Sequence, residues 1–202
     1  MPISRKVLTL AYHYMITSVF YKPFLKKSGS RFVIVKPIWF TPKYVSVGNN
    51  VVIRNNSRIE GVYNYEGVRY TPHIVIGNEV KIQQNMHLTC ASSVHIGDNT
   101  AIAANVTISD IDHGYQDIHT PPEKQPLMVY PVVIHADCKI YNNAVILPGT
   151  ILGKHCVVGA NSVVKGIFPD FCVIAGIPAK IMKRYNAGTG QWEKTNANGD
   201  FN

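Results

Sequence analysis

Isoleucine, leucine or valine recurs every six residues along most of this chain, and this period restricts the possible folds more than any other feature. Fifteen positions keep the period and fall into five groups of three: Val47, Ile53, Ile59; Ile76, Ile82, Leu88; Ile96, Ile102, Ile108; Ile134, Ile140, Ile146; and Leu152, Val158, Val164. Helices repeat every 3.6 residues and ordinary strands every two, so neither explains a period of six. A parallel β-helix does, because each six-residue unit supplies one short strand and one turn, and three units close one coil.

A small or β-branched residue usually follows four places after each of these positions. The set is Val51, Ser57, Val80, Thr100, Val106, Cys138, Ala144, Thr150, Cys156 and Ser162. In a β-helix both positions point inward, and successive coils stack at roughly 4.8 Å. Cys138 and Cys156 are one coil apart, so we expect them to stack inside the prism. That spacing permits a disulfide, but reduced thiols that fill the core explain it better, because nothing marks the chain as secreted.

Composition is consistent with one domain built of flat, neutral walls. The 202 residues are 46% hydrophobic and only 16% charged, with a formal net charge of +8. A basic protein of this kind can bind nucleic acid, an acidic membrane surface or a phosphorylated small molecule. No cluster of basic and aromatic residues resembles a nucleic-acid motif, so we expect one of the last two partners and no nucleic acid.

Residues 1–33 are predicted to form an N-terminal helical segment. Its apolar stretch of about fourteen residues is flanked by basic residues, namely Arg5, Lys6, Lys22, Lys26 and Lys27. A bilayer-spanning helix needs about twenty apolar residues, and no small-residue cleavage site of a signal peptide follows. Two interpretations stay open: a helix packed on the solenoid or on a neighbouring subunit, or one lying on an acidic inner membrane leaflet. We therefore expect a cytoplasmic protein, either free or peripheral to the inner membrane.

The interruptions of the repeat all occur after the third unit of a group. The spacing is 17 residues from Ile59 to Ile76, eight from Leu88 to Ile96, and 26 from Ile108 to Ile134. Whole coils have eighteen residues, so the three insertions are predicted to project from one edge of the prism. The longest loop, residues 109–131, is large for a compact domain and is therefore expected to be functional.

His113 lies in this longest loop and is followed by Gly114. The glycine permits a tight turn and a close approach of a ligand. A neutral imidazole at this place can act as a general base at physiological pH. The alternative is an ordinary turn residue, and the position of His113 in the largest insertion favours the base.

Three stretches of the sequence resemble the hexapeptide-repeat acyltransferases, and among these the sugar O-acetyltransferases of the galactoside and maltose type and the capsule or lipopolysaccharide acetyltransferases. They are residues 96–114, residues 144–150 with 158–165, and the Ala175-Gly176-Ile177-Pro178-Ala179-Lys180 segment. The resemblance implies an all-β fold, a left-handed parallel β-helix, here over residues 34–175. It implies a C-terminal segment at 176–202 with a short helix or a polar tail. We expect the tail from Asn186 to Asn202 to be disordered, with Trp192 anchoring part of it.

The same resemblance implies the chemistry and the site residues. His113 matches the catalytic histidine, which takes a proton from an acceptor hydroxyl as the oxygen attacks the thioester of acetyl-CoA, the co-substrate, with no metal required. Asn85 matches a contact to the acceptor sugar; its alternative role is to satisfy the backbone of a turn. The positions matching the CoA groove, which lies between the subunits of a homotrimer, are Ala160, Lys165, Ala179, Lys180 and Arg184. Basic residues there suit the phosphates of CoA.

Departures from the galactoside enzymes point to a different acceptor. Lys139 and Tyr141 stand where those enzymes carry tryptophan and glycine, and residues 90–93 lack their acidic acceptor contacts. These departures favour a polysaccharide-modifying enzyme whose carbohydrate acceptor is membrane-linked. An antibiotic or amino-sugar N-acetyltransferase remains an alternative, as does a scaffold without turnover, although the long loop argues against a scaffold. A zinc site as in γ-class carbonic anhydrases would use His87, His95, His113, His119 and His135, whose spacing does not match that class.

Overall fold

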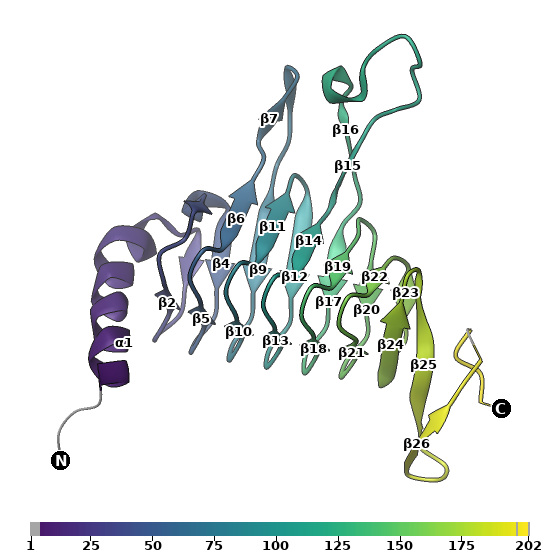
Figure 1. Ribbon diagram of the computed structural model, residues 1–202. Coiled ribbons are helices and arrows are strands. Elements are labelled where there is room, and N and C mark those ends of the chain that lie inside the picture. The colour runs from purple at the N-terminus through teal and green to yellow at the C-terminus, as the bar shows by residue number, and fades with distance from the viewer. Residues whose placement is uncertain (1–4, 197, 202) are drawn as a thin grey trace.

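Three parallel sheets, here A, B and C, form the walls of a long prism in the computed structural model, which describes residues 5–196 and 198–201 (Figure 1). Sheet A contains β1 (Lys27–Ser28), β4 (Val45–Val47), β9 (His73–Ile76), β12 (Ser93–Ile96), β17 (Val132–Ile134), β20 (Ile151–Leu152) and β23 (Ile167–Phe168). Sheet B contains β2 (Val33–Ile34), β5 (Val52–Ile53), β10 (Lys81–Ile82), β13 (Ala101–Ile102), β18 (Lys139–Ile140), β21 (Val157–Val158) and β24 (Cys172–Gly176). Sheet C contains β3 (Trp39–Phe40), β6 (Arg58–Gly61), β11 (His87–Cys90), β14 (Thr107–Ser109), β19 (Val145–Ile146) and β22 (Val163–Val164).

The chain visits sheets A, B and C in turn, so each six-residue unit supplies one strand and three units make one coil. Successive coils pair in parallel with the expected register, as in Ile82↔Ile102 and Leu88↔Ile108. All fifteen periodic residues are buried, with at most 3% of their surface exposed. The parallel β-helix predicted from the period is therefore confirmed, while the hand of the coil stays a prediction.

The small residues of the repeat also lie in the core. Cys138 and Cys156 are buried, and both carry free thiols that point to backbone carbonyl oxygens, of Gly153 and Pro169 respectively, each at 3.2 Å. Small side chains at this position allow the three walls to approach one another closely. The prediction that these cysteines fill the core is confirmed.

The β-helix extends beyond the predicted repeat at both ends. A first coil, β1–β2–β3, precedes the periodic region, with Ser28 opposite Val47 and Phe40 opposite Ile59. A last partial coil begins at β23, where Phe168 lies opposite Leu152. Serine and phenylalanine occupy these positions, so a search for isoleucine, leucine and valine passes over them. The predicted boundary between residues 33 and 34 thus falls inside the first coil.

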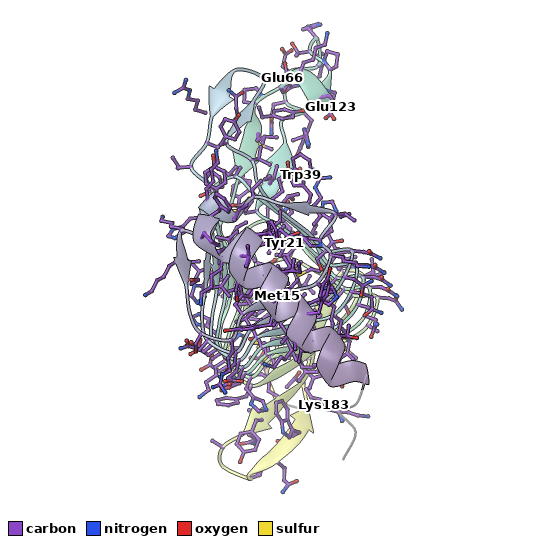
Figure 2. All side chains as sticks on the ribbon, turned by 90° about the vertical axis from the view of Figure 1, so that its left-hand side faces the viewer. Met15, Tyr21, Trp39, Glu66, Glu123 and Lys183 are labelled. Carbon is purple, nitrogen blue, oxygen red and sulfur yellow. The ribbon has the colours of Figure 1, made fainter. Side chains whose placement is uncertain are left out.

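An N-terminal helical segment lies across the first coil (Figures 1 and 2). It consists of α1 (Arg5–Ile16), the π-helical turn η1 (Thr17–Tyr21) and the 3₁₀ turn η2 (Lys22–Phe24); a further turn, η3, spans Pro42–Tyr44. The buried Thr17 hydroxyl accepts the N–H of Ile34 at 3.0 Å and donates to the carbonyl of His13 at 2.7 Å. The hydrogen bond to Ile34 occupies a backbone group of β2, which is the edge strand of sheet B. An edge strand with free backbone groups can pair with a strand of another molecule.

The predicted helix thus packs on the solenoid, and its residues 1–4 lie outside the described part of the chain. Within the described residues no helix is long and apolar enough to cross a membrane.

The C-terminal segment corrects the prediction of a short helix. It forms two antiparallel strands, β25 (Ala179–Asn186) and β26 (Gln191–Lys194), which continue sheet B after β24. The turn after β24 uses Gly176 with φ of +108°, and the chain then reverses onto the otherwise unpaired edge of the last strand. Trp192 stacks on His155 at 6.2 Å, which confirms the anchoring residue. The described tail is therefore a hairpin rather than disordered; residues 197 and 202 lie outside the description.

All three insertions connect sheet C to sheet A and therefore leave the prism at one edge. The first forms the hairpin β7 (Asn64–Tyr65) and β8 (Val68–Arg69). The longest carries the antiparallel pair β15 (Ile111–His113) and β16 (Leu127–Val129) and the turn η4 (Pro122–Lys124). Glu66 at the hairpin tip and Glu123 in the loop project to the same side (Figures 1 and 2). The prediction of one insertion-bearing edge is confirmed.

Candidate functional site

A cleft of about 580 Å³ opens between the two long insertions and the outer face of sheet C. Its wall residues come from the β7–β8 hairpin on one side and from the longest loop on the other, and its floor comes from three neighbouring strands. The lining consists of Arg58, Glu60, Val62, Asn64, Tyr65, His87, Thr89, Thr107, Ser109, Ile111, His113, Glu123 and Leu127. Residues up to 69 positions apart in the sequence meet here, from Arg58 to Leu127, so only the coiled fold creates this site.

The floor of the cleft is an ordered array of polar side chains. In a β-strand alternate residues face the same side, so each strand contributes its outward residues. Parallel pairing sets Arg58 beside His87 and Glu60 beside Thr89, with Thr107 and Ser109 in the next strand. The Thr89 hydroxyl donates to the Ser109 hydroxyl at 3.0 Å. Such a floor offers both hydrogen-bond donors and acceptors to a bound molecule.

The charged groups of the floor pair with each other. The Nε of Arg58 donates to Glu60 Oε2 at 2.7 Å, so the two charges largely cancel. Burial, and then the positive charge of Arg58, lower the pKa of His87. His87 is thus neutral at physiological pH, and the floor presents polar groups with little net charge.

His113 stands on β15 at the side of this cleft, with its imidazole partly exposed. Its Nδ1 lies 3.3 Å from Glu123 Oε2 and 3.4 Å from the hydroxyl oxygen of Tyr65. The Tyr65 ring meets the imidazole edge-on, with the ring centroids 5.3 Å apart. Within the described chain His113 Nε2 has no hydrogen-bond partner. One ring nitrogen is therefore held by the protein and the other is available to a ligand.

The hydrogen bonds of Tyr65 determine which nitrogen of His113 carries the proton. The phenolic hydroxyl makes its shortest contact, 2.6 Å, with the backbone carbonyl of Glu123, which can only accept. Because the hydroxyl has one proton, it acts as an acceptor toward Nδ1, as does the Glu123 carboxylate. Desolvation, and then the hydrogen bond to Glu123, raise the pKa of Tyr65, so the phenol stays protonated. The arrangement favours Nδ1–H and leaves the lone pair on Nε2.

Asp110 fixes the base of the loop that carries His113. Its fully buried carboxylate accepts three backbone N–H bonds, from Ala91 at 2.8 Å, Ser92 at 2.8 Å and Ser93 at 2.6 Å. Its own carbonyl accepts the N–H of Tyr130 at 2.8 Å, at the other end of the loop. The two-residue insertion after β11 and the longest loop are thus joined by one side chain.

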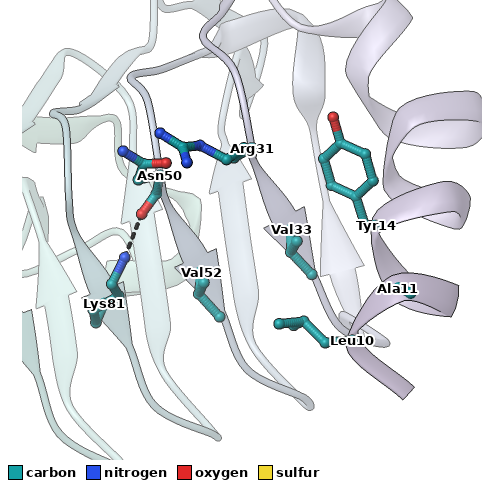
Figure 3. Close-up of a pocket in the computed structure, with 8 residues that line it drawn as sticks. All are labelled: Leu10, Ala11, Tyr14, Arg31, Val33, Asn50, Val52 and Lys81. Carbon is teal, nitrogen blue, oxygen red and sulfur yellow. Dashed lines mark hydrogen bonds between the residues drawn. The ribbon is translucent and has the colours of Figure 1, made fainter. Parts of the chain in front are cut away.

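A second hollow, of about 390 Å³, lies between α1 and sheet B (Figure 3). Its walls are mostly apolar and come from Leu10, Ala11, Tyr14, Val33 and Val52, with Arg31, Asn50 and Lys81 at its border. No histidine, cysteine or carboxylate is among the described residues that line it. The residues that the structure describes also form no group of three or more His, Cys, Asp or Glu placed to hold a metal ion within one chain. The chemistry-bearing side chains gather in the cleft of His113.

The bacterial transferase hexapeptide (six repeats) family matches residues 131–166, which are the two coils from β17 to β22. Six of the fifteen periodic residues, from Ile134 to Val164, lie within the match, and all six are buried in the core. These two coils are therefore similar to the hexapeptide-repeat transferases.

Two relatives with named activities are similar to this chain. The proposed lipopolysaccharide biosynthesis O-acetyl transferase WbbJ of Escherichia coli K12 is 41% identical over 128 residues, which cover 60% of this chain. Galactoside O-acetyltransferase of the same strain is 32% identical over 117 residues, or 58% of this chain. The chain spans 65% and 57% of the lengths of these two relatives, respectively. The resemblance inferred from the motifs is confirmed.

Solved structures share the fold over nearly the whole chain. An AntD variant, an N-acyltransferase from Bacillus cereus in complex with dTDP and coenzyme A, matches with a TM-score of 0.69 at 18% identity, covering 93% of this chain and 92% of AntD. Galactoside acetyltransferase in complex with coenzyme A matches with a TM-score of 0.56 at 20% identity, covering 95% and 84%. At such low identity these matches establish only the fold.

Asn85 lies away from the cleft, at the corner between β10 and β11. Its backbone has φ of +61°, a left-handed conformation that asparagine tolerates better than most residues. Its side-chain amide donates to Asn105 Oδ1 at 2.9 Å, and the series continues from Asn105 to Asn143 and from Asn143 to Asn161. These bonds stack one corner of the prism on the next. The structure thus accounts for Asn85 by its turn, and its contact to an acceptor stays a prediction.

The predicted CoA residues follow the C-terminal coils. Ala160 and Lys165 are exposed on either side of β22, and Lys180 is exposed on β25 beside the half-buried Ala179. Arg184 is engaged within the chain: its guanidinium donates to the carbonyl of Gly199 at 3.0 Å and lies over the ring of Phe201. Because a paired guanidinium must release its partners to bind phosphate, Arg184 is the least accessible member of this set.

Tyr65, Glu123 and Asp110 are the site residues that the sequence did not reveal. Tyr65 lies 48 positions before His113, and Glu123 stands between two prolines and a lysine, in a stretch without any motif. A usable signal was present only for Asp110, an acidic residue directly after a buried strand and next to the longest insertion. Tyr65 and His113 lie in two separate insertions, and the six-residue repeat contains no information about how its insertions contact each other.

Proposed function

We propose that this protein is an acetyl-CoA-dependent O-acetyltransferase that acts on a hydroxyl of a sugar or a polysaccharide precursor. The observation that carries the proposal is the orientation of His113, with Nδ1 held between Tyr65 and Glu123 and Nε2 unpartnered in a polar cleft. Such a histidine suits a general base. The O-acetyl transferase relatives, each covered over only part of its length, support this reaction class.

The reaction is a direct transfer. His113 Nε2 takes the proton of the acceptor hydroxyl while that oxygen attacks the thioester carbonyl of acetyl-CoA. The tetrahedral intermediate collapses, the carbon–sulfur bond breaks, and the proton on His113 passes to the leaving thiolate, which gives the acetyl ester and CoA. As the imidazole becomes charged, Glu123 and Tyr65 accept from Nδ1–H and stabilise it.

Acetyl-CoA supplies the acyl group, and the exposed Lys165 and Lys180 with Ala160 and Ala179 are the residues proposed to meet it. The cations suit its phosphates, and the small side chains leave room for its pantetheine arm. We further propose a left-handed coil and a homotrimer in which a neighbouring subunit closes the groove. CoA in the complexes of AntD and galactoside acetyltransferase supports this co-substrate.

The cleft favours a neutral, hydroxyl-rich acceptor. The charged pair Arg58–Glu60 is satisfied internally and His87 is uncharged, so the described residues of the cleft floor present no unpaired charge to an ionic substrate. Thr89, Thr107 and Ser109 offer the hydrogen bonds that carbohydrate hydroxyls use. An amino sugar is the second candidate, supported by the shared fold with the N-acyltransferase AntD.

Release of free CoA thiol with a panel of acceptors tests the proposed function. We expect acetyl-CoA to be consumed with neutral glycans or lipid-linked oligosaccharides, and mass spectrometry to show an acetyl group whose release by mild alkali identifies an ester. An alkali-stable product on an amino sugar would replace O-transfer by N-transfer. Absence of thiol release with every acceptor class would contradict the proposal.

Tyr65→Phe tests whether this residue positions the base. Loss of the hydroxyl removes one acceptor at Nδ1 of His113, and we expect kcat to fall about tenfold with little change in KM for acetyl-CoA. Tyr65→Phe and Glu123→Gln should be non-additive, since both act on the same nitrogen. The matched control is Tyr63→Phe, in the same insertion but outside the cleft lining, with kcat unchanged. Strict additivity of the two effects would contradict a shared role.

A further inference from the structure

The positive charge of the chain is concentrated at its N-terminal end. The first 59 residues contain ten of the 20 Lys and Arg residues and none of the 12 Asp and Glu residues; the first acidic residue is Glu60. The remaining 143 residues hold ten basic and 12 acidic residues. The whole net positive charge therefore belongs to the N-terminal helical segment and the first two coils.

Large apolar side chains are exposed at the same end. His13 and Thr17 point inward and are buried against the prism. Elsewhere in α1, η1 and η2 five large apolar side chains are exposed, each with 54% to 62% of its surface accessible: Tyr12, Met15, Val19, Phe20 and Phe24. Lys22, Lys26 and Lys27 lie among and directly after them. We call these eight residues the N-terminal face; Figure 2 views the molecule from this end, with Met15 on the near side of the helix.

This combination has the properties of an element that lies in a membrane interface. Apolar and aromatic side chains enter the region between headgroups and acyl chains, and basic side chains beside them attract anionic lipids. The 12 residues of α1 are fewer than the about twenty that span a bilayer, and a position along the membrane surface requires no such length. We propose that the N-terminal face binds a lipid surface that carries anionic headgroups.

The charge distribution argues against a second copy of the chain as the occupant. Two N-terminal ends brought together would place ten cations against ten, with no acidic residue before Glu60 to compensate them. An anionic bilayer supplies the missing opposite charge. Docking by this end also leaves the hairpin and loop free at the side of the prism, so the cleft of His113 stays open toward an acceptor near the membrane (Figure 1).

Co-sedimentation of the full-length protein with vesicles tests the inference without any assay of acetyl transfer. Vesicles of phosphatidylcholine with about one third phosphatidylglycerol should bind the protein, and pure phosphatidylcholine should not. A Lys or Arg near an anionic surface contributes about a fivefold change in binding, so Lys22→Gln/Lys26→Gln/Lys27→Gln should weaken it about a hundredfold. Phe20→Ser/Phe24→Ser should weaken it at least tenfold.

The matched control removes three cations elsewhere, in Lys154→Gln/Lys183→Gln/Lys194→Gln, and should bind like the unchanged protein. Circular dichroism and thermal unfolding verify that every variant is folded. Binding that is absent, equal on neutral vesicles, or lost equally in the control would overturn the proposal. So would a Phe20→Ser/Phe24→Ser protein that becomes monomeric in light scattering while the unchanged protein ignores vesicles, because the face would then join copies of this chain.

Discussion

His113→Ala should lower kcat/KM for acetyl transfer by a factor of about 10² to 10⁴, the range that a positioned general base contributes. The methyl group cannot take the proton of the acceptor, and among the described residues that line the cleft the one other histidine is His87, on the floor. The measurement is the release of free CoA thiol at saturating acetyl-CoA. Because the variant changes a partly exposed side chain on an insertion, its stability should stay within about 0.5 kcal/mol of the unchanged protein.

The pH dependence of kcat/KM distinguishes two roles of His113, a general base and a residue that only contacts the ligand. A general base gives the logarithm of kcat/KM an acid limb that a residue making only a contact does not give. In His113→Ala this limb should disappear, leaving a low, flat rate. His119→Ala is the matched control, an exposed histidine of the same loop outside the cleft, and should keep both the rate and the limb. An unchanged rate in His113→Ala would remove the proposed base.

The regular part of the fold was predictable because the physics of the repeat is local. Each buried residue at the first position is followed by a small inward residue, and this pattern alone predicts the walls, the core cysteines and the edge that carries the insertions. The pattern does not predict the first coil and the last partial coil, because Ser28, Phe40 and Phe168 stand where it requires isoleucine, leucine or valine. Their strands nevertheless pair in the same parallel register as the others. At the C-terminus β25 pairs with the open edge of β24, so a strand forms where the resemblance implied a short helix or a tail.

The site was only partly predictable because it depends on contacts between insertions. The sequence predicts His113 because it lies in the longest insertion and because residues 96–114 resemble the hexapeptide-repeat acyltransferases. Tyr65 and Glu123 were not, since the distance of 3.4 Å between Tyr65 and His113 joins two loops of different coils. Asn85 is a different case. The resemblance implies a contact to the acceptor, which stays a prediction, and the left-handed turn and the bond to Asn105 give a second reason for an asparagine at that position.

Asp110→Ala should be the most destabilising single change at the site. It leaves three backbone N–H groups, of Ala91, Ser92 and Ser93, without the carboxylate that accepts them in the core. An unsatisfied buried donor costs about 1 to 3 kcal/mol, and water entering the gap recovers part of it, so we expect a loss of about 3 kcal/mol or more in the free energy of unfolding. Urea unfolding monitored by circular dichroism measures it.

The same substitution should also lower activity in protein that is still folded, because Asp110 holds the loop at the place where β15 begins to carry His113. A displacement of about 1 Å in a catalytic group costs roughly 10²-fold in rate. Asp112→Ala, two residues further along the same loop and partly exposed, is the stability control and should change the unfolding free energy by less than about 0.5 kcal/mol. Asp110→Asn keeps the shape but turns an amide NH₂ toward backbone donors, and we expect most of the loss to remain. If Asp110→Ala unfolds within 1 kcal/mol of the unchanged protein, the carboxylate does not hold the two insertions together, and the position of His113 must depend on the β15–β16 pairing alone.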